Sequence, residues 1–333
     1  MTAPLPGLDL DALAAHLGHG PLSGELVSGG RSNLTYLVCD ERRSWIVRRP
    51  PLGHVLATAH DMARKYRVMT ALAGTGVPVP ETYRLCEDES VLGAPFYVMQ
   101  NVVGEVYRTA KSAAGLGLGR LTAVARELGE VLARLHRVDP TAVGLADFGR
   151  PDGYLARQVT RWSKQLAASR SREVAGIDEL RDRLAAGLPE TTRSTIVHGD
   201  YRLDNVILGP DDRIRAVVDW EMATLGDPLT DIGMLMLYWD MLVTGQGMFG
   251  AVPEGAEFPP GRVLLEAYAA AGGAELDRLG WYLAFATFKL AVISEGIHYR
   301  FRAGQTVGAG FERIGEAVPL LVERGHAILN EGA

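Results

Sequence analysis

The sequence is poor in cysteine and contains no long hydrophobic run. Its 333 residues include two cysteines, Cys39 and Cys86, which lie far apart and outside any Cys-x-x-Cys motif. We therefore expect two reduced thiols rather than a disulfide framework or a zinc site. The most apolar segment, 232–243, is too short to cross a bilayer and contains Asp240. The N-terminus lacks a basic segment followed by an apolar run, so no signal peptide is expected and we predict a cytoplasmic protein.

An excess of positive charge is also absent. The formal net charge is −6, and the hydrophobic and charged fractions of 47% and 22% are ordinary for a globular protein. Because no overall basic field would attract a polyanion, neither nucleic acid nor a membrane surface is an expected partner. The length is sufficient for one large domain or two smaller ones.

Strand patterns occupy the first hundred residues and helical patterns the remainder. Alternation of apolar residues and flanking turn residues predict strands at 34–38, 45–49, 83–86 and 95–99. Apolar residues at helical spacing predict helices at 9–17, 57–73, 121–135, 228–243, 261–271, 276–300 and 309–329. A turn is expected at 87–90. This order predicts an α+β fold with a β-rich N-terminal lobe, 1–101, and a larger α-helical C-terminal lobe, 102–333.

The stretch from 195 to 221 spaces two carboxylates and one amide around a predicted hairpin. Asn205 follows Asp200 by five residues, and Asp219 follows Asn205 by fourteen. Strands at 206–208 and 214–218 would place Asn205 and Asp219 at the same end of the hairpin. Amide and carboxylate oxygens suit Mg²⁺, which proteins usually hold through one or two carboxylates together with phosphate oxygens. We expect Asn205 and Asp219 to bind Mg²⁺ and Asp200 to act as a base for a substrate hydroxyl.

This spacing resembles the catalytic loop of protein kinases and, more closely, the aminoglycoside phosphotransferase family, where His-Gly-Asp-x-x-x-x-Asn precedes Ile-Asp-Trp or Ile-Asp-Phe. The corresponding residues here are His198-Gly199-Asp200, Asn205 and Val218-Asp219-Trp220. From about Gly29 to Arg300 the chain is similar to the branch related to the kinase domain of acyl-CoA dehydrogenase family members 10 and 11. The resemblance implies a bilobal protein-kinase-like fold and phosphorylation of a small-molecule hydroxyl with ATP and Mg²⁺ as cofactors.

The resemblance also implies a nucleotide site in the first lobe. Small residues in a hairpin near 26–36 would let backbone N–H groups approach phosphate oxygens. Arg48 stands where kinases carry a phosphate-binding lysine, and arginine can bind phosphate through two donors. The segment 96–102 resembles the strand that leads to the hinge, where the backbone would hydrogen-bond the adenine edge. The expected nucleotide-binding residues are Ser28, Gly29, Gly30, Ser32, Asn33, Arg48, Met99, Gln100 and Val102.

Further roles in the catalytic loop follow from the same resemblance. Arg202 lies two residues after Asp200, where protein kinases keep a lysine that contacts the transferred phosphate. We expect Arg202 to be catalytic, with an ordinary surface arginine as the alternative. Asp204 is expected to pair with Arg202 or with a substrate cation. His198 is expected to hold the loop by hydrogen bonds, and Asp231 to anchor the loop backbone and cap the next helix.

One position departs from the branch. The helix after the Arg48 strand reads Arg-Lys-Tyr-Arg over residues 64–67, where relatives read Arg-Glu-Tyr-Arg and the Glu pairs with the basic strand residue. Lys65 removes that ion pair and puts a like charge near Arg48, and Asp61 is a candidate substitute for the acid. A nucleotide-binding pseudokinase or regulatory module is therefore the alternative to an active kinase. The complete Asp-Asn-Asp set opposes it.

The acceptor is expected to bind in the second lobe. Aminoglycoside polycations need a dense carboxylate surface, and because this half shows no acidic cluster, an aminoglycoside kinase is the weaker alternative. The resemblance to a domain linked with acyl-CoA dehydrogenases points to a hydroxy acid or hydroxyacyl-CoA. A protein kinase is disfavoured because a helix follows Asp219 too closely for a long activation loop. Candidate acceptor-site residues are Trp162, Tyr238, Trp239, Trp281, Glu295, His298, Tyr299 and Arg300.

Overall fold

The computed structural model describes residues 5–27, 33–52, 61–246, 250–305 and 311–331. They form two compact units. The first comprises the chain up to Glu105 together with Val206–Ala223, and the second comprises Val106–Asn205 together with Thr224 onward. The predicted boundary after residue 101 lies near the first crossing between the units. The sequence pattern alone gives no sign that the hairpin groups with the first unit.

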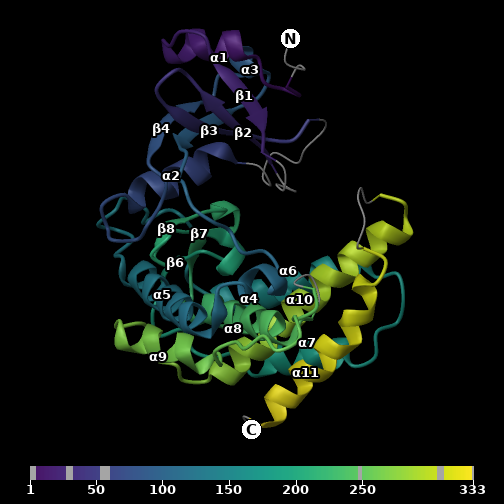
Figure 1. Cartoon of the computed structure of the whole chain (residues 1–333). Helices are drawn as coiled ribbons and strands as arrows, with labels where there is room; N and C mark the ends of the chain where they lie inside the picture. Colours follow the sequence, from purple (N-terminus) through teal and green to yellow (C-terminus); the bar gives the residue numbers. More distant parts are fainter. Residues whose placement is uncertain (1–4, 28–32, 53–60, 247–249, 306–310, 332–333) are drawn as a thin grey trace. The chain divides into compact units, whose positions relative to one another are not determined.

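An antiparallel sheet of five strands lies at the centre of the first unit (Figure 1), in the order β1-β2-β3-β5-β4. The strands are β1 Ser23–Leu26, β2 Leu34–Cys39, β3 Ser44–Arg49, β4 Thr82–Cys86 and β5 Phe96–Gln100. Tyr36 and Val38 of β2 and Trp45 and Val47 of β3 are buried. Because successive side chains of a strand point to opposite faces, this burial explains the alternation in the sequence.

The helices of the first unit differ in detail from the prediction. The described helices of the first unit are α1 Leu10–Leu17, α2 Met62–Leu72 and α3 Glu89–Leu92. α2 begins after its N-cap Asp61, and residues 57–60 of the predicted helix lie outside the described residues. The turn predicted at 87–90 is wrong in part. The Asp88 side chain accepts a hydrogen bond from the N–H of Ser90 and caps the short helix α3.

The hairpin of the first unit agrees with the sequence prediction. β7 (Val206–Leu208) and β8 (Ile214–Val217) pair antiparallel, with Val206 opposite Val217. The 3-10 helix η1 (Leu203–Asn205) directly precedes β7, and η2 (Trp220–Met222) follows β8. The backbones of Glu105 and Leu208 exchange two hydrogen bonds of 2.9 Å. These bonds join the hairpin to the rest of the unit.

The second unit consists mainly of helices (Figure 1). They are α4 Ala110–Ala114, α5 Gly117–Arg137, α6 Tyr154–Ser169, α7 Ile177–Ala186, α8 Leu229–Thr244, α9 Arg262–Ala270, α10 Leu279–Arg302 and α11 Ala317–Glu331, with the 3-10 helix η4 Ile314–Glu316. A small antiparallel pair, β6 (Thr195–Val197) and β9 (Thr224–Gly226), lies among them. α10 packs against α6, α8 and α11. It is therefore the central helix of this unit, which explains why its sequence is apolar on nearly every side.

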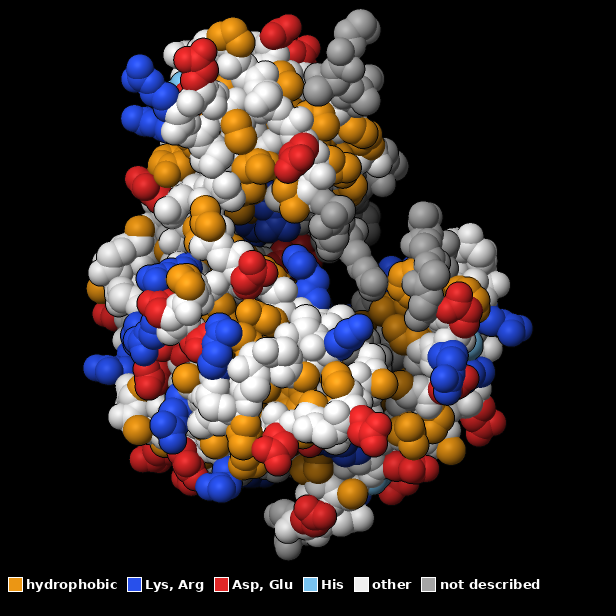
Figure 2. Space-filling model, in the orientation of Figure 1, with side chains coloured by type: hydrophobic (Ala, Val, Ile, Leu, Met, Phe, Trp, Pro, Cys, Tyr) orange, Lys and Arg blue, Asp and Glu red, His pale blue; other side chains and the backbone are white. Residues whose placement is uncertain are grey.

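Charged side chains of both signs are interspersed over the helices of the second unit, on the face that Figure 2 shows. Exposed ion pairs on this unit include Arg170–Asp178 and Arg262–Glu266. Such pairs contribute little to stability because water screens them. Within the described ranges, no helix combines the length and apolar character needed to span a membrane.

Gly233 of α8 lies against the backbone of α10 at Tyr282. A Cβ atom added there would lie 2.5 Å from the carbonyl oxygen of Tyr282, and backbone atoms move aside only with difficulty. We expect Gly233→Ala to lower the free energy of unfolding by about 1–3 kcal/mol through overpacking. Urea denaturation followed by circular dichroism measures this change.

Gly119→Ala, in α5, is the matched control. No described atom lies within 4 Å of the Cβ position at Gly119. Because alanine is the better helix former, this variant should be as stable as the parent or slightly more stable. Equal losses in the two variants would contradict the packing argument.

Candidate active site

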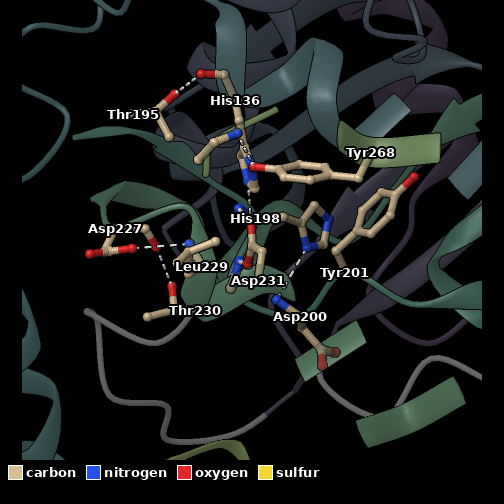
Figure 3. Close-up of polar contacts among 12 residues, drawn as sticks. His136, Thr195, His198, Asp200, Tyr201, Asp227, Leu229, Thr230, Asp231 and Tyr268 are labelled. Atoms are coloured by element: carbon tan, nitrogen blue, oxygen red, sulfur yellow. Dashed lines mark hydrogen bonds and ion pairs between the residues drawn. The ribbon is translucent and has the colours of Figure 1, made fainter. Parts of the chain in front are cut away.

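The predicted catalytic loop lies between β6 and η1 in the second unit (Figure 3). Gly199 has a φ of 82°, in the left-handed region that favours glycine. Asp231, in the first turn of α8, accepts hydrogen bonds of 2.7 Å from the backbone N–H groups of His198 and Gly199. The imidazole of His198 is fully buried, and its Nδ1 accepts a hydrogen bond of 3.3 Å from the N–H of Asp200. These bonds position the backbone that leads into Asp200, as predicted for His198 and Asp231.

Asp231 is also fully buried and lies against His136 (Figure 3). Nε2 of His136 is 3.2 Å from Oδ2 of Asp231, and Nδ1 of His136 is 2.9 Å from the hydroxyl of Tyr268. Burial acts to raise the pKa of Asp231, but the hydrogen bond and charge of His136, with the contribution of His198, bring this pKa below its usual range. The carboxylate therefore stays ionised inside the protein and can serve several donors at once.

The predicted capping role of Asp231 is wrong. Asp231 already lies within the first turn of α8. The side chain of Asp227 instead accepts a hydrogen bond of 3.0 Å from the N–H of Leu229 (Figure 3). Tyr282 donates to the other oxygen of Asp227 at 2.8 Å. The two acids of this segment thus have different roles. Asp227 accepts a hydrogen bond at the start of α8, and Asp231 accepts hydrogen bonds from the catalytic loop.

Asp200 and Asn205 lie side by side. Nδ2 of Asn205 donates to the backbone oxygen of Asp200 at 2.8 Å and to its Oδ2 at 3.0 Å. Both amide hydrogens are therefore engaged, and the amide oxygen is left as the atom of Asn205 that can bind a cation. The side chain of Asp200 is 27% exposed, so the carboxylate is accessible to a substrate.

Arg202 lies between two carboxylates. Its Nε is 3.4 Å from Oδ2 of Asp200 and 2.9 Å from Oδ1 of Asp204, and its guanidinium lies 4.8 Å from the ring centroid of Tyr238. The predicted pairing with Asp204 is confirmed, and a side chain only 17% exposed is not an ordinary surface arginine. Burial raises the pKa of Asp204, and the charge of Arg202 opposes this shift. Tyr238 also hydrogen-bonds Asp200, and burial raises the pKa of its phenol well above the usual value.

Lys289 of α10 makes a contact that the sequence analysis missed. Its Nζ donates to the carbonyl oxygen of Gly199 at 2.8 Å and lies 5.5 Å from the ring centroid of Trp162. Burial lowers the pKa of the ammonium group, and the negative charge of Asp200 opposes this shift. The guanidinium of Arg161 lies 5.6 Å from the same ring. Positive charge thus gathers around Trp162 and the catalytic loop. A lysine within an otherwise apolar helix is the signal that could have identified it.

The remaining acceptor-site candidates have structural contacts or lie at the end of α10. Trp239 and Trp281 each donate an indole N–H to a backbone carbonyl, at 3.0 and 3.1 Å respectively. Glu295 is fully buried and paired with Arg172 at 2.9 Å. The last turns of α10 contain His298, Tyr299 and Arg300. Of the candidates, Tyr238 and Trp162 are the ones that the structure connects to the catalytic loop.

Arg48 and Asp219 form an ion pair in the first unit, with 3.4 Å between Nη2 and Oδ1. The side chain of Arg48 is 12% exposed, and its buried Nε has no hydrogen-bond acceptor among the described residues. Asp219 has a φ of 67°, an uncommon conformation outside glycine that is often found at functional sites. Its carboxylate is 32% exposed. A buried donor without an acceptor suits a phosphate oxygen, and a partly exposed carboxylate suits a divalent cation.

Lys65 has its own acidic partner. Its Nζ lies 3.4 Å from Oε2 of Glu221, which also accepts a hydrogen bond of 3.4 Å from Nδ2 of Asn33. Burial lowers the pKa of Lys65, and Glu221 opposes this shift. Asp61 is not the substitute acid, because its carboxylate accepts a hydrogen bond from the N–H of Arg64 and caps α2. The acidic partner in this region therefore comes from η2 and not from α2.

Several predicted nucleotide contacts are not tested by this geometry. Ser28, Gly29, Gly30 and Ser32 lie outside the described residues. Met99 is buried in β5, and Val102 follows that strand and is partly exposed. The N–H of Gln100 donates to the carbonyl of Glu81 at 2.8 Å, so this N–H already has an acceptor within the protein.

Comparison with known proteins bears on nearly the whole chain. Residues 23–282 match the family model described as the phosphotransferase enzyme family. Acyl-CoA dehydrogenase family member 10 of Mus musculus is 34% identical over 91% of this chain, and family member 11 of Gallus gallus is 35% identical over 92%. The chain spans only 29% and 40% of the length of those two relatives. A solved structure from Ralstonia eutropha, provisionally named an aminoglycoside phosphotransferase, has a TM-score of 0.84 at 34% identity and covers 97% of this chain and 98% of its own.

Proposed function

This chain belongs to the phosphotransferase enzyme family, and from that premise we propose that it transfers a phosphoryl group from ATP to a hydroxyl of a small molecule. The α+β kinase-like fold expected from the sequence is the fold of its solved relative. In this fold, catalysis depends on positioning and charge neutralisation more than on covalent chemistry. Such a reaction needs a residue that accepts the proton of the hydroxyl, residues that bind the metal, and residues that bind phosphate oxygens.

The observation that carries the proposal is the contact between Asp200 and Asn205 on a loop whose backbone Asp231 holds. A carboxylate in that position can orient the attacking hydroxyl and accept its proton. The adjacent Arg202 is proposed to contact the transferred phosphate. Its ion pair with Asp200 would then be exchanged for one with the substrate, which is favourable because arginine binds phosphate through two donors.

Mg²⁺, when bound, would neutralise charge on the nucleotide phosphates. The protein ligands that the sequence predicts for it, the amide oxygen of Asn205 and the carboxylate of Asp219, stay a proposal. Among the described residues, no group of three or more His, Cys, Asp or Glu side chains is arranged around a metal position. Proteins usually hold Mg²⁺ through one or two side chains together with phosphate oxygens and water. Arg48, whose Nε has no acceptor among the described residues, is proposed to bind the nucleotide phosphates.

The acceptor is proposed to be a hydroxy acid or a hydroxyacyl-CoA. Lys289 and Arg161 place positive charge around Trp162, next to the loop that carries Asp200. Such surroundings favour an anionic acceptor and disfavour an aminoglycoside polycation. The names of the two animal relatives refer to acyl-CoA dehydrogenases, and the link from those names to the acceptor of this chain is an analogy.

Matched acceptors test the proposal directly. Purified full-length protein would be incubated with Mg-ATP and a hydroxyacyl-CoA, a free hydroxy acid, its methyl ester or an aminoglycoside. Mass spectrometry would detect the gain of one phosphate. We expect the anionic acceptors to react and the ester to react about fivefold more slowly than its acid, since loss of an ion pair worth about 1 kcal/mol slows a reaction by about that factor. Faster reaction of the ester or the aminoglycoside would contradict the acceptor assignment, and binding of ATP without any transfer would favour the pseudokinase.

A further inference from the structure

Four charged side chains of the first unit form a cluster in which the signs alternate. Arg48 of β3 lies 3.4 Å from Asp219, and Lys65 of α2 lies 3.4 Å from Glu221. Arg48 and Lys65 also influence each other, because the charge of Arg48 acts to lower the pKa of Lys65. Two cations and two acids are therefore present, and the cluster as a whole is neutral.

The two cationic side chains of the cluster are less exposed to solvent than the two acidic ones. The cationic side chains are 12% and 4% exposed for Arg48 and Lys65, whereas the acidic side chains are 32% and 24% exposed for Asp219 and Glu221. A ligand or ion from solvent therefore reaches the acids first. The charge of these acids would repel a polyanion, unless the two buried cations cancel it.

The presence of lysine at position 65 decides that balance. With a glutamate in place of Lys65, the same cluster would contain one cation, Arg48, and three acids. A nucleoside triphosphate without metal is a polyanion, and a cluster with excess negative charge would repel it until Mg²⁺ had neutralised part of the total. A neutral cluster imposes no such requirement. Nε of Arg48, buried and without an acceptor among the described residues, provides a donor for a phosphate oxygen.

We propose that Lys65 neutralises this cluster and thereby allows the first unit to bind the polyphosphate of a nucleotide through Arg48 without a divalent cation. The inference rests on the proposed function, because it takes the nucleotide as the ligand of this unit. It goes further in assigning an order, in which the nucleotide can bind first and the metal afterwards. Lys65 affects nucleotide binding through its charge, and its own ion-pair partner is Glu221.

Isothermal titration calorimetry of the full chain with ATP, first in EDTA and then in excess Mg²⁺, tests the proposal. We expect the parent to bind ATP in both conditions. Lys65→Glu should weaken binding in EDTA by about tenfold or more and weaken it less in Mg²⁺, since the metal restores the missing positive charge. Lys65→Arg should bind like the parent. Arg42→Glu, the same charge reversal at an exposed turn of the same unit, is the matched control.

A double variant keeps the test informative if Lys65→Glu does not fold, as judged by circular dichroism. Lys65→Glu combined with Glu221→Lys reverses the ion pair between positions 65 and 221 and keeps the net charge of the cluster at zero. This double variant should therefore recover ATP binding in EDTA. Absence of ATP binding by the parent in EDTA, with binding in Mg²⁺, would overturn the inference and leave the proposed function intact. Equal weakening by Lys65→Glu and Arg42→Glu would also overturn it. Absence of ATP binding in both conditions would refute the nucleotide assignment itself.

Discussion

Replacing Asp200 by asparagine is expected to reduce kcat for phosphoryl transfer by about 10²–10⁴-fold, the usual contribution of a positioned general base. The amide keeps the size of the side chain but cannot accept the proton of the attacking hydroxyl. The contact with Nδ2 of Asn205 can persist, because an amide oxygen also accepts hydrogen bonds. Nucleotide affinity, measured by calorimetry, should therefore remain close to that of the parent while turnover is lost.

Asp211→Asn provides the control for this prediction. Asp211 lies in the turn between β7 and β8, where its side chain is 50% exposed and pairs with Arg215. The same chemical change at this position should leave kcat nearly unaltered, since exposed ion pairs contribute little. If Asp200→Asn retains a large part of the parent kcat, Asp200 is not the base and the assignment of the catalytic loop fails.

Asp231→Asn is expected to lower the free energy of unfolding by about 3–5 kcal/mol, the typical cost of breaking a buried ionic network from one side. Asp231 accepts hydrogen bonds from His198 and Gly199 and contacts His136, all in a fully buried position. An amide has one acceptor oxygen, so its NH₂ group would face a buried N–H group and leave that donor unsatisfied. Urea denaturation at neutral pH measures the loss.

The pH dependence gives this prediction a second test. Because the folded-state pKa of Asp231 is lowered, its contribution is complete above the unfolded-state pKa of about 3.9 and is lost as the pH falls through the lower, folded-state value. The stability difference between parent and variant should therefore be constant from neutral pH to about pH 5 and shrink below about pH 4. Asp178→Asn, in an exposed pair, should change stability by at most about 1 kcal/mol. A difference that grows on acidification would contradict the role of Asp231 as a buried anion.

Local signals in the sequence were sufficient for most elements of the fold. The hairpin at 206–217 could be predicted because a Gly-Pro-Asp-Asp turn separates two short apolar runs. The helix α5 could be predicted because its buried residues recur at helical spacing. The short helix α3 was missed because its start depends on one side-chain cap, at Asp88, within a polar segment that reads equally well as a turn.

Contacts between residues far apart in the sequence were the features of the candidate site that were hardest to predict. Asp231 and the loop after β6 share a motif that made their pairing predictable, whereas His136 and Tyr268 come from α5 and α9 and carry no motif. Lys289 was missed for the same reason, because its partner Gly199 lies 90 residues earlier in the chain. The partner of Lys65 also depended on tertiary structure. The sequence showed which acid was absent from α2 but could not show that Glu221 supplies one.

The chain crosses between its two units three times, after Glu105, Asn205 and Ala223. A fragment that ends at residue 105 would lack β7, β8 and Asp219, and the complementary fragment would carry a hairpin deprived of its bonds to Glu105. Neither unit is thus a single continuous segment of the gene. Recombination that exchanges one contiguous N-terminal piece between relatives would separate Arg48 from Asp219, so an exchange that preserves their ion pair must also transfer residues 206–223.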